Sequence, residues 1–317
     1  MLQTFTAGRV CRAVAPRRIQ TRGRLAYLAG SFVIAAAILL ALPGAVQAEW
    51  AVYQYSFSAP GAPITMMVHS NGELWVGTWT ALRRYTKTGT LLGTIGPFAA
   101  AGLAEASNGD VFVGDYYGLR ILRYTSGGTL VRQWATGGTR TSRLAVDASD
   151  NVYAALYTNA GLSVGKIVLY AGGTGAMLHS CSGIPVVNGI AYKDGTVYTV
   201  PRNGGVLKTY TSDLQPLGSF PTGGTYHEQL IIDSHANLWL ADYGTRCVLA
   251  FTSAGTRLGA IGPAVSGYGT ILPEAVAVDP SGPIFVGDNT QQRVVVFGSP
   301  ATAITPAAWS AVKQLFR

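Results

Sequence analysis

The sequence is poor in cysteine, histidine and charged residues. Three of its 317 residues are cysteine, four are histidine, and Asp, Glu, Lys and Arg together make up 12 %. Zinc centres need several converging His or Cys side chains, so we expect none here. Two cysteines follow the N-terminal segment, Cys181 and Cys247, and they fall in non-adjacent units of the repeat described below. We therefore expect no disulfide between them and treat both as small buried apolar residues.

Acidic residues are also few, and the basic excess is concentrated near the N-terminus. The chain has 23 Lys and Arg against 15 Asp and Glu, a formal net charge of +8. Six of the basic residues and none of the acids lie in residues 1–48, so the remaining 269 residues carry 17 basic and 15 acidic residues, a net +2. Nucleic-acid binding requires a strong basic excess. We therefore predict that no nucleic acid is a partner.

Residues 1–48 have the features of a secretory signal. Arginines precede an apolar run, residues 25–42, that is apolar apart from Ser31, and Pro43 then ends this run before small residues lead to Ala48. The order of basic, apolar and small residues predicts cleavage after Ala48 and export, to the periplasm or outside the cell. The alternative is an uncleaved membrane anchor, because an apolar run of this length is just sufficient to span a bilayer.

One short pattern recurs six times after this segment. A turn rich in Asn, Gly, Ser and Asp precedes an apolar residue, an aromatic residue and two small or apolar residues. The aromatic residues are Trp75, Phe112, Tyr153, Tyr198, Trp239 and Phe285. Their spacings are 37, 41, 45, 41 and 46 residues, a mean of 42. This period is the length of a four-stranded propeller blade, so we predict an all-β, six-bladed β-propeller over residues 49–300.

The sixth repeat predicts only three strands. Residues 273–279, 284–287 and 293–297 are strand-like, but an Ala-rich tail follows them. Residues 50–57 are strand-like and precede the first blade. We predict that this N-terminal strand closes the last blade, because closure removes an exposed sheet edge. The tail, residues 301–317, predicts a short amphipathic C-terminal helix, with Trp309, Val312, Leu315 and Phe316 on one face.

The stretch VAVDPSGPIFVGDNTQQRVVVF, residues 276–297, resembles the NHL repeat. The resemblance extends over residues 63–297 and implies a six-bladed propeller, whereas NHL propellers include adhesive, ligand-binding and enzymatic members. The first Asp position of the repeat is held by Asp147, Asp233 and Asp279, and the second by Asp115, Asp242 and Asp288. An Asp at a strand end accepts hydrogen bonds from turn amides, so we assign the first group a structural role. His69 holds the same turn position in blade one.

Counting back from each aromatic residue locates one end of the predicted channel, where the innermost strands begin. Eleven residues back lie Ile64, Ala101, Ser142, Val187, Glu228 and Glu274, and ten back lie Thr65, Gly102, Arg143, Asn188, Gln229 and Ala275. On blades one and two these positions hold mainly small or apolar residues, whereas on blades three to six they include Arg143, Asn188, Glu228, Gln229 and Glu274. Propeller ligands bind at this end, so we look for function here.

The carboxylates of Glu228 and Glu274 and the amide of Asn188 have oxygen atoms suited to a divalent cation such as Ca²⁺. The chain is similar in overall form to gluconolactonase-type propellers, which implies an alternative function, a metal-dependent hydrolase, lactonase or lyase that uses these three residues. The competing interpretation is that Arg143 pairs with Glu228 or Glu274 without catalysis. We expect no cofactor, and a divalent cation only under the alternative.

Loops after the second strands carry aromatic residues, interleaved with polar ones. The candidate ligand-binding residues are Trp79, Tyr116, Tyr117, Tyr157, Arg143, Arg202, His227, Tyr243 and Asn289. Aromatic rings exposed around a polar mouth favour recognition of a glycan, a peptide or a partner protein; the alternative is that several of them fold back and cover blade edges. The leading hypothesis is an exported, monomeric, non-catalytic binding propeller, which contacts the membrane only if its N-terminal segment stays uncleaved.

Overall fold

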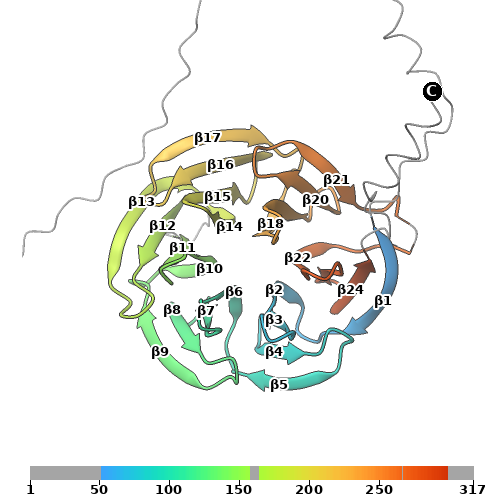
Figure 1. Ribbon diagram of the computed structural model, residues 1–317, viewed down its shortest axis with the longest axis horizontal. Coiled ribbons are helices and arrows are strands. Elements are labelled where there is room, and N and C mark those ends of the chain that lie inside the picture. The colour runs from blue at the N-terminus through green and yellow to red at the C-terminus, as the bar shows by residue number, and fades with distance from the viewer. Residues whose placement is uncertain (1–50, 158–163, 266, 299–317) are drawn as a thin grey trace, which may run out of the picture.

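Six antiparallel sheets of four strands each form a ring in the computed structural model (Figure 1). The structure describes residues 51–157, 164–265 and 267–298. All the regular secondary structure in these ranges is β-strand, so the predicted all-β, six-bladed propeller is confirmed. The predicted signal or anchor and the C-terminal helix lie outside the described residues. No helix in the described ranges is long and apolar enough to cross a membrane.

The first three blades follow the chain in order. Blade one comprises β2 (Pro63–Val68), β3 (Leu74–Thr78), β4 (Leu82–Tyr85) and β5 (Leu91–Ile95). Blade two comprises β6 (Ala100–Glu105), β7 (Val111–Asp115), β8 (Arg120–Tyr124) and β9 (Leu130–Ala135). Blade three comprises β10 (Arg140–Val146), β11 (Val152–Tyr157), β12 (Val164–Tyr170) and β13 (Met177–Pro185).

Blades four and five also follow the chain in order, whereas blade six takes its fourth strand from the N-terminal part of the chain. Blade four comprises β14 (Val187–Lys193), β15 (Thr196–Pro201), β16 (Val206–Thr211) and β17 (Pro216–Pro221). Blade five comprises β18 (His227–Ile232), β19 (Asn237–Asp242), β20 (Cys247–Thr252) and β21 (Arg257–Ile261). Blade six comprises β22 (Pro273–Val278), β23 (Ile284–Asp288), β24 (Arg293–Gly298) and β1 (Val52–Ser58).

Strand β1 closes the ring, as predicted. It pairs antiparallel with β24, from Val52 opposite Gly298 to Ser58 opposite Arg293. The blue β1 lies beside the red β24 at the rim of the ring in Figure 1. Because β24 would otherwise present an unpaired edge, this pairing completes the sixth blade with the first strand of the chain.

The six repeated aromatic residues fill the interfaces between blades. Their exposed fractions lie between 0 and 7 %. Trp75 of blade one is buried with Val111 and Val113 of blade two, and Phe285 of blade six is buried with Met66 of blade one. An aromatic ring buries a large apolar area, so one ring per blade ties each sheet to the next. The repeat is therefore a packing signal.

The repeated polar residues at the ends of the innermost strands hold turns. Oδ1 of Asp147 accepts hydrogen bonds from the backbone N–H groups two and four residues later, at 2.8 and 2.9 Å. Asp233 makes the same pair of bonds, at 2.9 and 2.8 Å. In blade one, Nδ1 of His69 accepts from the backbone N–H of Asn71 at 3.0 Å. These contacts confirm the structural role predicted for this position.

The two cysteines of the propeller are not bonded to each other. Cys181 is fully buried in β13 of blade three. Cys247 begins β20 of blade five and is a half-buried free thiol that donates to the backbone oxygen of Thr245 at 3.4 Å. The expected absence of a disulfide between them is confirmed, although Cys247 is less buried than we predicted.

Candidate functional site

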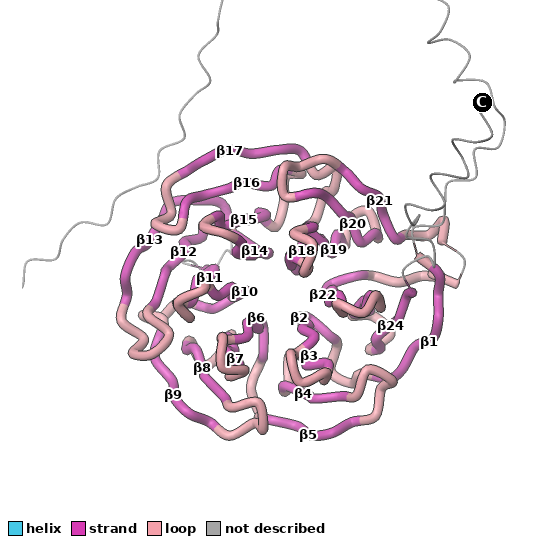
Figure 2. Tube along the Cα trace, viewed as in Figure 1, coloured by secondary structure: helices cyan, strands magenta, loops and turns pink. Residues whose placement is uncertain are grey.

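A β-bulge near the start of each innermost strand shapes one end of the channel, which we call the mouth. The innermost strands are β2, β6, β10, β14, β18 and β22, nearest the centre of Figure 2. The bulged residues are Ile64, Ala101, Ser142, Asn188, Glu228 with Gln229, and Glu274. A bulge leaves a residue outside the strand ladder and redirects its side chain. In blade four this residue is Asn188, so the count of eleven residues, which gave Val187, was one residue too long there.

The mouth contains a cavity of about 130 Å³. Its lining residues are Trp79, Ala101, Tyr116, Ser142, Arg143, Tyr157, Asn188, Arg202, Glu228 and Glu274. Eight of the twelve candidate residues from the sequence are among them. The other four lie outside the lining: Tyr117, His227 and Asn289 contact lining residues, and Tyr243 contacts Tyr226, which packs against the lining residue Arg202.

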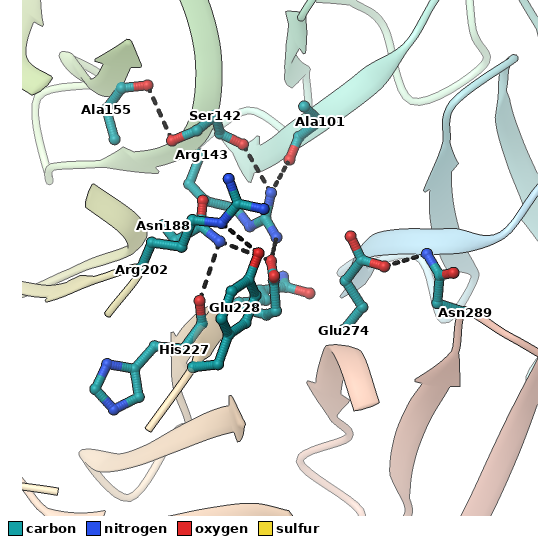
Figure 3. A network of polar contacts seen from close by, with 12 residues as sticks. Ala101, Ser142, Arg143, Ala155, Asn188, Arg202, His227, Glu228, Glu274 and Asn289 are labelled. Carbon is teal, nitrogen blue, oxygen red and sulfur yellow. Dashed lines mark hydrogen bonds and ion pairs between the residues drawn. The ribbon is translucent and has the colours of Figure 1, made fainter. Parts of the chain in front are cut away.

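Arg143 and Glu228 link blades three and five across the channel. Nη2 of Arg143 lies 3.1 Å from Oε2 of Glu228, and both side chains are 8 % exposed. Nη1 of Arg143 donates to the backbone oxygens of Ala101 at 3.1 Å and Ser142 at 3.0 Å. The edge of an innermost strand that faces the channel has no further strand to pair with. Its carbonyl groups therefore need side-chain donors, and the guanidinium of Arg143 supplies them for Ala101 and Ser142. Figure 3 shows this network.

Asn188 joins the network through its amino group. Nδ2 donates to Oε2 of Glu228 at 2.8 Å and to the backbone oxygen of His227 at 3.0 Å. A backbone oxygen can only accept, so this bond determines the orientation of the amide. Oδ1 of Asn188 consequently accepts from the hydroxyl of Tyr157.

This geometry does not fit the oxygen set that the sequence suggested for a divalent cation. Asn188 turns its donor toward Glu228, whereas a cation site needs oxygens directed at one point, and Arg143 donates to the same oxygen of Glu228. Within residues 51–157, 164–265 and 267–298 no group of three or more His, Cys, Asp or Glu side chains is arranged to hold a metal ion.

The two carboxyl groups of the mouth titrate near neutral pH. Burial and then the charge of Glu274 raise the pKa of Glu228 to about 8, although Arg143 opposes the rise. Burial also raises the pKa of Glu274 to about 7, against the lowering effects of Arg143 and of a hydrogen bond that Asn289 donates. In Figure 3 the pair of Glu274 and Asn289 lies apart from the network around Arg143.

His227 does not line the cavity. Its ring is fully buried, with Nδ1 2.9 Å from the backbone oxygen of Pro201 and Nε2 2.8 Å from Oγ1 of Thr222, and in Figure 3 it points away from Glu228. Burial lowers the pKa of this imidazole. The backbone N–H of His227 donates to the backbone oxygen of Arg202 at 2.8 Å. His227 therefore holds the loop that carries Arg202.

Aromatic rings form a continuous wall beside the cavity, on blades one to three. The rings of Trp79 and Tyr116 lie 5.5 Å apart and meet edge to face, and Tyr116 meets Tyr157 in the same way at 5.9 Å. Tyr117 contacts Trp79 at 6.2 Å and Tyr116 at 5.1 Å. Trp79 is 38 % and Tyr117 is 64 % exposed, whereas Tyr116 and Tyr157 are each 7 % exposed. The wall thus has a buried inner part and an exposed outer part.

A second aromatic group flanks the cavity on blades four and five. The guanidinium of Arg202 lies over the ring of Tyr226 at 4.9 Å, and its Nε donates to the Tyr226 hydroxyl. Tyr243, which is 40 % exposed, contacts Tyr226 at 5.6 Å. Tyr226 was not among our candidate residues, and its position directly before β18 is the signal that identifies it. It joins Arg202 and Tyr243 into one unit.

Comparisons with known proteins identify the fold class, a β-propeller, and no more. No family model and no curated protein matches the sequence. A catalytically inactive virginiamycin B lyase from Staphylococcus aureus with quinupristin is 18 % identical, with a TM-score of 0.56 over 75 % of this chain and 81 % of that chain. A streptogramin B lyase is 13 % identical, with a TM-score of 0.57 over 80 % of this chain and 99 % of that chain. The WD40 propeller domain of Doa1 is 12 % identical, with a TM-score of 0.56 over 82 % of this chain and 99 % of that chain.

Proposed function

We propose that this protein is an exported, non-catalytic, NHL-type propeller that binds a ligand or a partner protein at its mouth. The observation that carries the proposal is the continuity of exposed aromatic rings with a polar cavity. Trp79 lines the cavity, and Tyr117 extends the same wall outward. Exposed aromatic side chains beside a polar recess are typical of surfaces that bind a partner and exclude water from it.

The arrangement of the polar side chains favours binding over metal-dependent hydrolysis. A hydrolase of that kind would use oxygens of Glu228, Glu274 and Asn188 on one ion, but Asn188 presents its amino group to Glu228. Lyases and a WD40 domain share the propeller fold, so the assignment depends on the site and not on the fold. The basic, apolar and small residues of segment 1–48 support export.

The proposal is tested by screening for ligands with a matched set of variants. The wild-type protein, the double variant Trp79→Ala with Tyr117→Ala, and the control Met177→Ala are applied to glycan and peptide arrays. Met177 is 66 % exposed on the outer strand β13, so its loss removes a comparable exposed side chain far from the mouth. We expect a ligand that binds wild type and the control but is lost from the double variant. Equal binding by all three proteins, or no ligand at all, would contradict the proposal.

A further inference from the structure

Three features of the mouth, taken together, indicate which class of ligand it accepts. They are the charge balance of the cavity, the hydrogen-bonding atoms left without partners, and the position of the aromatic wall. The inference rests on the proposed function, because it names the ligand of that same site.

The cavity holds two cationic and two acidic side chains. Arg143 and Arg202 line it together with Glu228 and Glu274. Arg143 and Glu228 already form an ion pair at 3.1 Å. A cationic ligand group would meet two guanidinium groups, and an anionic one would meet two carboxyl groups, at short range in a partly desolvated space where charges interact strongly. Above about pH 8 both carboxyl groups are ionised, and the balance of two cationic and two anionic groups then favours an uncharged ligand.

Donors and acceptors remain available on the same cavity wall. Nε of Arg143 is buried and has no hydrogen-bond partner among the described residues, a state that costs about 1–3 kcal/mol. Asn289 donates to Oε2 of Glu274, and in the described part of the chain Oε1 of Glu274 accepts no hydrogen bond. Arg202 uses its Nε on Tyr226, and its two terminal nitrogens have no partner within the described ranges. A ligand that both donates and accepts at neighbouring atoms would satisfy these groups.

Hydroxyl groups on adjacent carbons have this property, because each hydroxyl is both a donor and an acceptor. The cavity of about 130 Å³ has room for roughly four water molecules, and two or three hydroxyl groups on one edge of a sugar ring would replace them. A peptide offers one backbone donor and one acceptor per residue, which is a sparser pattern in so small a space.

The aromatic wall complements the other surface of a sugar. Trp79 belongs both to the cavity lining and to the exposed wall. A pyranose ring has an apolar C–H face that packs on an aromatic ring, which buries apolar area on both partners. A sugar with its hydroxyl edge in the cavity would place its C–H face against Trp79 and the next sugar unit over Tyr117.

We propose that the mouth binds the terminal unit of an uncharged oligosaccharide, with vicinal hydroxyls between Glu274 and Arg202 and the ring packed on Trp79. The probe is an array of neutral hexose and N-acetylhexosamine oligosaccharides, followed by titration calorimetry of the strongest hit. Variants are Trp79→Ala, Trp79→Phe and Glu274→Ala, with Met177→Ala as the control. Calorimetry at 50 and 500 mM salt tests for charge, because salt screens ionic contacts.

We expect affinity to fall about tenfold or more in Trp79→Ala and Glu274→Ala, to recover partly in Trp79→Phe, and to stay within about twofold between the two salt concentrations. Thermal unfolding of each variant shows whether a loss of affinity reflects misfolding. If only peptides bind and the double aromatic variant abolishes that binding, the saccharide inference fails while the mouth remains a binding site. If a neutral saccharide binds equally to every variant, both the inference and the proposed function fail.

Discussion

Replacing Glu228 with Gln is expected to flatten the pH dependence of stability. The pKa of Glu228 is about 8 in the fold, against 4.5 for an ordinary Glu carboxyl. A carboxyl group with a raised pKa in the folded state binds more protons there than in the unfolded chain. Its contribution to stability is therefore complete below pH 4.5 and is lost as the pH rises through about 8.

The expected size follows from the proton balance. Between pH 6.5 and 8.5 the unfolded carboxyl is already ionised, while the folded one changes from protonated to ionised. This costs the fold about 2 kcal/mol, or about 4–8 °C in Tm for a domain of this size. Burial lowers the pKa of His227 below 6.5, and the opposite contribution of that imidazole is small above this pH. Glu274 and Glu228 raise each other's pKa by charge repulsion, so the difference between the two profiles measures the loss of Glu228 together with its effect on Glu274.

The assay is urea unfolding at pH 6.5, 7.5 and 8.5 for wild type, Glu228→Gln and the control Glu73→Gln. A glutamine at 228 keeps an acceptor for Arg143 and Asn188. The Arg84 side chain, 2.7 Å from Glu73, holds the pKa of that carboxyl below 4.5, so Glu73→Gln should leave the slope in this window unchanged. Parallel profiles for wild type and Glu228→Gln would refute the reasoning.

Three further outcomes are expected. Arg143→Met leaves Glu228 buried without its partner, so at pH 8.5 the fold must either bury an unpaired charge or bind a proton, which should cost up to about 3–5 kcal/mol in urea unfolding; adding Glu228→Leu should recover at least half, and no recovery would contradict the assigned ion pair. Deleting residues 49–58 removes β1 and exposes the edge of β24, so size-exclusion chromatography should show oligomers or aggregates, whereas a stable monomer would show that closure is dispensable. The exported protein should begin at Glu49 by intact mass; a membrane-bound chain that retains residues 1–48 would indicate an anchor instead.

Much of the mouth could be predicted because the blades repeat. The distance of a residue from its repeated aromatic indicates which end of the channel it lies at, and Arg143, Asn188, Glu228 and Glu274 were found in this way. Counting from the repeated aromatic residue does not show which of two adjacent side chains faces the cavity. His227 precedes Glu228 directly, but neighbouring side chains on a strand point to opposite sides, and its ring is buried away from the cavity.

The sequence by itself determined the number of blades, the closure by the first strand and the residue types gathered at the mouth. These properties follow from local patterns, namely strand periodicity, turn residues and a fixed spacing. Only the tertiary structure decided which side chains meet. Arg143 and Glu228 are 85 residues apart, and Asn188 and Glu228 are 40 apart. Contacts across a channel depend on how a bulge in each blade aims its side chain relative to the others, and no local pattern records that relation.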